Sequence, residues 1–215
     1  MVKYLSTPLV IITAFSLLGC EPKPVEIPVV EAPAPVEQVS VALPDATSIL
    51  SAQEAFWGGL TLLCGKSFAG KLVSTDEVDA DMADQDMSMT VNCADGKINI
   101  PFAVGDNRSR TWMFSKTESG LNLSHRHNHE DGSEDTVSQY GGDTATDGTT
   151  TRQEFPADGF SIALFMLQEL EASMANVWAV EITPEIYAYE LTREGRHFRV
   201  EFDVTKEIDT PIIPW

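Results

Sequence analysis

Three of the four histidines in this chain occupy alternate positions of one short segment, at His125, His127 and His129. Leu121 and Leu123 precede them at the same spacing, and polar residues fill the positions between. Successive side chains of a β-strand point to opposite faces, so the histidines share the face of the leucines if this segment is a strand. The spacing therefore predicts a strand that runs from an apolar interior to an imidazole-lined end.

This spacing allows two neighbouring imidazoles, but not all three, to bind one metal ion. Alternate strand positions lie about 7 Å apart, whereas His125 and His129 would lie about 13 Å apart. A carboxylate from the following segment could complete a zinc-like divalent metal site. The candidates there are Glu130, Asp131, Glu134 and Asp135. One alternative function is thus a metal-dependent envelope hydrolase that uses the His125/His127/His129 strand, with a base such as Glu134.

Two arginines are expected beside the histidines. A hairpin with its turn around Ser119 places Arg108 and Arg110 opposite the histidine end. Guanidinium groups bind carboxylates and phosphates, so these two residues form a candidate anion site. A third interpretation needs no ligand, because Arg–carboxylate and His–carboxylate pairs would hold the polar end of the sheet together. The sequence leaves these interpretations open and identifies no catalytic residue.

Alternating apolar residues predict β-strands through most of the chain. The clearest hairpin runs from Met87 to Val104 around the turn Asp95-Gly96. A second hairpin spans Thr111 to about Asn128. Further strands are expected over Asp135–Tyr140, Thr149–Phe155, Val177–Ile182, Tyr187–Thr192 and His197–Val204.

One or two short helices accompany the strands. A capping-box pattern at Ser51 predicts a helix that Gly58-Gly59 ends early, and apolar spacing predicts another over Ile162–Met174. About ten strands with hairpin connections favour a mainly β fold. The expected architecture is an antiparallel up-and-down, calycin-like β-barrel, because closure removes exposed sheet edges. A β-sandwich is the alternative. A barrel of this size can hold one small ligand.

The N-terminal segment predicts where the protein resides. Lys3 precedes an apolar run that ends in Leu17-Leu18-Gly19-Cys20 and is too short to span a bilayer. This order resembles the lipobox of bacterial lipoproteins. The resemblance implies a signal peptide over residues 1–19 and acylation of Cys20, which becomes the anchor in the lipid bilayer. Glu21 in the next position implies, by the same resemblance, sorting to the outer membrane, facing the periplasm.

A proline-rich segment separates the anchor from the folded domain. Residues 20–45 carry repeated prolines without helical or strand periodicity, which favours an extended tether. Residues 46–215 then form one β-barrel-like domain, expected to be monomeric. The net charge of −19 excludes nucleic acid as a partner, and membrane attachment must come from acyl chains such as palmitate.

Acylation of Cys20 leaves two cysteines, Cys64 and Cys93, in an exported and oxidising setting. A disulfide bond between them is expected, and two buried free thiols are the alternative. Neither cysteine has a histidine at metal-ligand spacing.

Several stretches of the domain resemble a family of uncharacterised bacterial secreted proteins and lipoproteins. They are Phe56–Leu60, Arg108–Trp112, His125–Asp135, Tyr140–Thr144, Phe155–Asp158 and Phe198–Asp203. The resemblance carries no activity, cofactor or site residue. The sequence as a whole therefore predicts an envelope lipoprotein whose β domain binds a small ligand or a metal, or serves an envelope partner protein.

Overall fold

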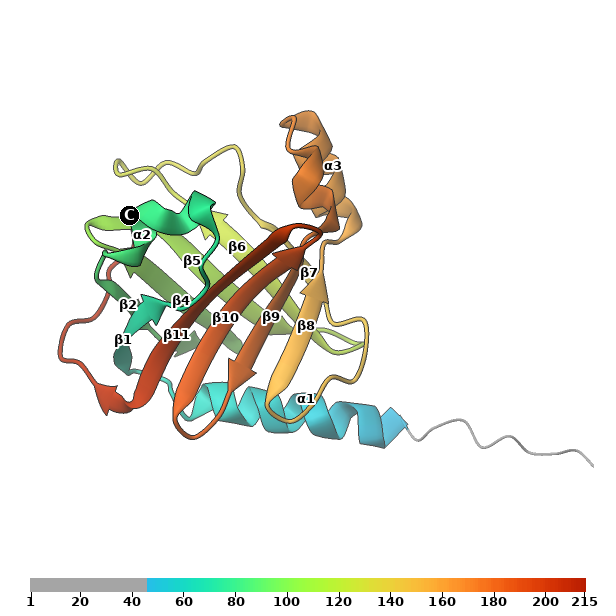
Figure 1. Cartoon of the computed structure of the whole chain (residues 1–215). Coiled ribbons are helices and arrows are strands. Elements are labelled where there is room, and N and C mark those ends of the chain that lie inside the picture. The colour runs from blue at the N-terminus through green and yellow to red at the C-terminus, as the bar shows by residue number, and fades with distance from the viewer. Residues whose placement is uncertain (1–45) are drawn as a thin grey trace, which may run out of the picture. The chain divides into compact units, whose positions relative to one another are not determined.

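The computed structural model describes residues 46–215, with side chains from Ala52 onward. The predicted signal peptide, Cys20 and the proline-rich segment lie outside the described residues and stay predictions. The described chain is mainly β, with eleven antiparallel strands and three α-helices (Figure 1). The strands form one nearly closed, barrel-like sheet. The expected barrel is therefore confirmed, and the sandwich alternative is wrong.

The sheet consists of two meanders joined by the first and last strands. Strand β1 pairs with β2 on one side and with β11 on the other, so the order is β7-β6-β5-β4-β2-β1-β11-β10-β9-β8, with β3 beside β4. The strands are β1 (Ser67–Leu72), β2 (Met87–Thr90), β3 (Asn92–Ala94), β4 (Lys97–Val104), β5 (Asn107–Lys116), β6 (Leu121–His127), β7 (Tyr140–Asp143), β8 (Arg152–Pro156), β9 (Val177–Ile182), β10 (Ile186–Arg193) and β11 (Arg196–Glu207).

A short seam between β7 and β8 brings the two ends of the sheet together. The Asp158 backbone N–H donates to the Gly141 carbonyl oxygen at 2.9 Å. The buried Ser161 hydroxyl donates to the same oxygen at 2.8 Å and accepts from the Gly141 N–H at 2.7 Å. A Cβ atom on Gly142 would lie 1.9 Å from the Pro156 carbonyl oxygen. Only glycine lets the strand ends approach this closely.

Helix α1 (Ala46–Thr61) lies across one end of the barrel (Figure 1). It begins five residues before Ser51, so the predicted capping box is wrong. It also continues through Gly58-Gly59, where an early end was expected. Phe56 and Leu60 are fully buried against the barrel, and this burial outweighs the weak helix propensity of glycine.

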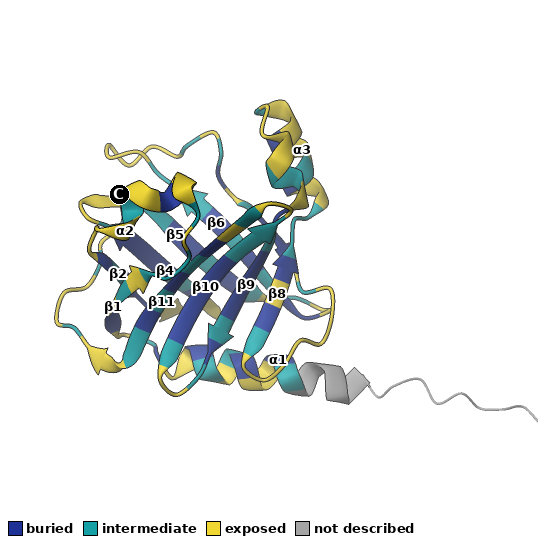
Figure 2. Ribbon diagram, in the orientation of Figure 1, coloured by how far each residue is buried: buried dark blue, intermediate teal, exposed yellow. Residues whose placement is uncertain are grey.

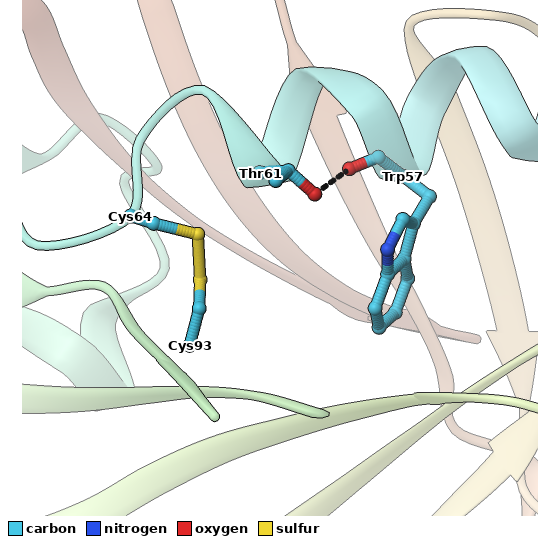
Figure 3. Close-up of a disulfide and its surroundings, with 4 residues drawn as sticks. All are labelled: Trp57, Thr61, Cys64 and Cys93. Carbon is cyan, nitrogen blue, oxygen red and sulfur yellow. Dashed lines mark hydrogen bonds between the residues drawn. A yellow bond between two sulfur atoms is a disulfide. The ribbon is translucent and has the colours of Figure 1, made fainter. Parts of the chain in front are cut away.

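A disulfide bond between Cys64 and Cys93 ties the end of α1 to β3 (Figure 3). The two Cα atoms are 5.6 Å apart, and 29 positions separate the residues in sequence. The predicted pairing is confirmed. Closing a loop of this length is worth about 3.5 kcal/mol in the chain-entropy model.

Helices α2 (Ala80–Ala83) and α3 (Gly159–Leu167) lie at the opposite end of the barrel (Figure 1). The helix expected over Ile162–Met174 is instead α3 followed by a 3-10 helix, Glu171–Ala175, because Glu169 adopts a left-handed φ of 58° between them. Within residues 46–215, no helix is both long and apolar enough to cross a membrane.

The strand expected over Asp135–Tyr140 is a loop, and β7 begins only at Tyr140. The Asp135 carboxylate accepts from the Val137 N–H at 2.8 Å, and this local turn replaces strand pairing. The inward faces of the remaining strands are buried along most of their length (Figure 2). The barrel interior is thus a packed core, except at the end where α2 lies.

Candidate functional site

A cavity of about 180 Å³ lies in the barrel at the end opposite α1. It opens where inward-facing residues of β4, β5, β6, β10 and β11 reach the end of their strands. Five of its lining residues are aromatic: Phe102, Trp112, Tyr140, Tyr189 and Phe198. Its polar lining includes Arg110, His125, His127, Asp79 and Arg196.

Parallel aromatic rings form the apolar wall of the cavity. Trp112 stacks on Tyr189 with ring centroids 4.4 Å apart, and on Phe102 at 4.8 Å. The interplanar angles are 18° and 16°, so the three rings form a nearly parallel stack. These residues come from β5, β10 and β4, so barrel closure is what assembles them.

His125 lies at the base of the cavity and uses both ring nitrogens in the fold. Nδ1 is 3.0 Å from the Tyr140 carbonyl oxygen, and Nε2 is 2.7 Å from the Tyr189 hydroxyl. A carbonyl oxygen only accepts, so Nδ1 donates and Nε2 accepts from the hydroxyl. Burial lowers the pKa of His125 to about 3. His125 is therefore a neutral structural residue with no lone pair left for a metal ion.

His127 lies one layer closer to the cavity mouth and is half-buried. Its Nε2 is 2.8 Å from the Tyr140 hydroxyl. Burial and then the charge of Arg110 lower the pKa of His127 to about 4, against a weaker opposite effect of Asp135. Burial also raises the pKa of Tyr140 to about 12. Both groups are consequently uncharged at neutral pH.

The two arginines of the cavity differ in their partners. Arg196 binds Asp79 through two contacts of 2.6 and 2.7 Å, and Asp76 at 2.9 Å. Arg110 donates from Nη1 to the Asn107 side-chain oxygen at 3.3 Å. Among residues 52–215, no ion pair involves Arg110. Within that part of the chain, its guanidinium is the cation of the cavity lining without a carboxylate partner.

The predicted hairpin register is correct, but only some of the predicted site residues line the cavity. Arg110 pairs with His127, and Trp112 pairs with His125, across β5 and β6. His129 lies beyond the end of β6 and is exposed. Arg108 is also exposed, and it lines a separate surface depression with Trp215.

The four candidate carboxylates lie in the loop after β6, outside the cavity lining. Glu130 is exposed. Asp131 accepts from the Ser133 N–H at 2.9 Å, Asp135 accepts from Val137, and Glu134 accepts from Ser138 and Gln139. These bonds lower the pKa of all three carboxyl groups and fold the loop. Across residues 52–215, no three His, Cys, Asp or Glu side chains are placed to hold a metal ion together.

Sequence reasoning missed most of the aromatic wall. Trp112 could have been found, because it shares the inward face of β5 with Arg110. Phe102 could also have been found, because it pairs with Arg110 across the β4–β5 hairpin. Tyr189 gave no comparable signal, since β10 is far from β5 and β6 in the sequence.

The fold and the site together define a nearly closed antiparallel β-barrel with an aromatic cavity and a cationic mouth. No protein-family model matches the chain, and no curated protein shows significant similarity to it. Function is therefore argued from the geometry of the cavity.

Proposed function

We propose that this protein is an envelope lipoprotein whose barrel binds a small organic ligand in the cavity opposite α1. The observation that carries the proposal is the cavity itself, with stacked rings on its wall and a few polar groups at its mouth. Concave, mainly apolar sites with a small number of placed polar groups are typical of small-molecule binding. The arrangement holds no activated nucleophile, so binding is favoured over catalysis.

The cavity volume supports a ligand of one ring. An engineered cavity of about 150 Å³ in another protein binds benzene. The cavity here is about 180 Å³. A monocyclic compound with one polar substituent matches this volume, whereas a long-chain lipid does not.

The cellular setting rests on the N-terminal residues. The lipobox-like Leu17-Leu18-Gly19-Cys20 supports a protein anchored in the bacterial outer membrane through acylated Cys20, facing the periplasm. The Cys64–Cys93 bond is compatible with that oxidising compartment. A net charge of −19 disfavours nucleic acid, so the expected partners are the bilayer, a small ligand and envelope proteins.

The metal-dependent hydrolase has less support. Both ring nitrogens of His125 are hydrogen-bonded, and His129 lies beyond the end of β6. The nearby carboxylates lie in the loop after β6, where three of them accept hydrogen bonds from loop residues. No observation on the cavity favours this second function.

Benzyl alcohol, a neutral one-ring probe, tests the proposal. We expect it to shift the NMR signals of ¹⁵N-labelled tryptophan side chains in the detergent-solubilised full chain, with saturation at millimolar concentration. Leu191→Trp should abolish the shifts, because Leu191 lines the cavity and a larger side chain would fill it. Leu62→Trp, at an exposed position after α1, is the matched control. Absence of binding, or equal binding to the Leu191→Trp variant, would contradict the proposed function.

A further inference from the structure

We infer that the cavity selects a small aromatic carboxylate, with Arg110 binding the carboxylate and the stacked rings binding the flat body. This inference rests on the proposed function and narrows it to one chemical class. Three observations support it: the charge of Arg110, unpaired among residues 52–215, the neutrality of the neighbouring His127 and Tyr140, and the flat apolar wall behind them.

The contrast between the two arginines sets the sign of the ligand charge. Asp79 and Asp76 neutralise Arg196 at short distances. Arg110 forms no such pair among residues 52–215, although the chain carries 33 acidic residues against 14 basic ones. A half-buried guanidinium with unused N–H donors favours a carboxylate as its ligand. Its planar N–H groups can bind two carboxylate oxygens at once.

The neighbouring polar groups do not oppose an anion. His127 stands directly opposite Arg110 across the β5–β6 pair, and its ring bonds to the Tyr140 hydroxyl. Both are neutral at pH 7, and because one of their two protons lies in this mutual bond, the pair keeps one donor for an anion. The negative charge of Asp135 acts on both His127 and Tyr140, but this residue lies in the loop after β6, outside the cavity lining. Asp79 and Arg196 also line the cavity, but they pair with each other, so Arg110 is the lining charge without a carboxylate partner among residues 52–215.

The spacing along β5 fits a compact ligand. Arg110 and Trp112 are consecutive inward positions, which places their Cα atoms about 7 Å apart. The guanidinium can thus meet a carboxylate while the attached ring lies beside Trp112 and Tyr189. The nearly parallel stack of these rings favours a flat body over a branched aliphatic one.

Benzoate and benzyl alcohol have nearly the same shape but differ in charge. Comparing them therefore separates the proposed binding of a one-ring ligand from the inferred preference for a carboxylate. At pH 7.5 we expect the full chain to bind benzoate at least about tenfold more tightly than benzyl alcohol. Arg110→Gln should remove that preference, read as the ratio of the benzoate and benzyl alcohol dissociation constants within each variant. Arg110→Lys should give an intermediate preference, because it keeps the charge but loses the fork. Arg108→Gln, on the same strand but outside the cavity, is the matched control.

The outcomes are distinguishable. If benzyl alcohol binds and benzoate binds no better, the carboxylate inference is wrong and the proposed function stands. If benzoate is preferred equally by wild type and Arg110→Gln, Arg110 is not the receptor and the inference is again wrong. If neither probe binds, the proposed function is wrong, and the inference fails with it. Should Arg110→Gln not fold, the wild-type comparison and Arg110→Lys still decide the inference.

Discussion

Two histidines in one strand have unequal roles, although the sequence presents them as equivalent. His125 connects three strands, because its ring bonds to the Tyr140 carbonyl oxygen of β7 and the Tyr189 hydroxyl of β10. His127 lies at the cavity mouth beside Arg110, and its ring bonds to the Tyr140 hydroxyl. Burial lowers the pKa of both rings, so the fold depends on their neutral form.

This dependence predicts a loss of stability in mild acid. The unfolded chain protonates both histidines near pH 6.5, whereas the folded pKa values are about 3 for His125 and about 4 for His127. The contribution of the two histidines to the free energy of unfolding should therefore be complete above about pH 6.5. It should decrease as the pH drops toward 4. Each histidine should contribute a slope of about 1.4 kcal/mol per pH unit within that window.

Urea denaturation at pH 7, 6, 5 and 4.5 measures this slope. His127→Gln should remove the contribution of one of the two histidines. The change in unfolding free energy per pH unit should then fall by about half above pH 5. The carboxyl groups of the neighbouring loop have lowered pKa values, so their contribution to stability is lost only as the pH falls below their ordinary values of 3.8 to 4.5, and the slope above pH 5 reports the histidines. Equal slopes for the wild type and the His127→Gln variant would show that His127 is not held neutral by the fold.

At the scale of elements, the seam between β7 and β8 decides whether the barrel closes. Few hydrogen bonds link these strands, and the Ser161 hydroxyl of α3 supplies two of the contacts. Close approach of backbones replaces a regular ladder there. Tyr140, which shapes the cavity, is the first residue of β7, so the seam also positions the site.

Gly142→Ala tests the seam. The added methyl would lie 1.9 Å from the Pro156 carbonyl oxygen, and that backbone atom has little room to move. We expect the free energy of unfolding to fall by roughly 1–3 kcal/mol or more, measured by urea denaturation. Gly159→Ala is the matched control, since its added methyl would meet nothing within 4 Å. Similar stability of both variants would mean that β7 and β8 do not approach closely in solution.

At the scale of the whole molecule, an acidic domain is expected to depend on acyl chains for membrane attachment. A net charge of −19 repels anionic headgroups, and no helix of residues 46–215 could cross a bilayer. The proposed attachment through Cys20, which lies outside the described residues, stays a prediction.

Cys20→Ser should abolish labelling by radioactive palmitate in the producing bacterium and release the protein from the membrane fraction. The reason is that several acyl chains on one residue give stable anchoring, and the variant would have none. Fractionation with immunodetection measures the change, and Cys93→Ser is the control that should stay membrane-bound. Continued labelling and sedimentation of the Cys20→Ser variant would contradict the lipobox interpretation.

Local pattern alone determined much of this protein. Alternation and the turn Asp95-Gly96 predicted the first hairpin, and both turn residues adopt the positive φ that such a turn requires. The second hairpin predicted the pairing of Arg110 with His127. The barrel and the Cys64–Cys93 bond also followed from strand pattern, connection length and cysteine count. Each of these predictions used only neighbours in sequence or a single count.

Tertiary structure alone decided the rest. Helix α1 passes through Gly58-Gly59 because its apolar face is buried on the barrel, which local propensity cannot show. The aromatic wall forms because β1 pairs with β11 and brings β10 opposite β5, across most of the chain. The same closure gave Arg196 its carboxylates and, within residues 52–215, left Arg110 without one. The alternation of a strand specifies which side chains face inward, but only the closed sheet determines which of them share a cavity.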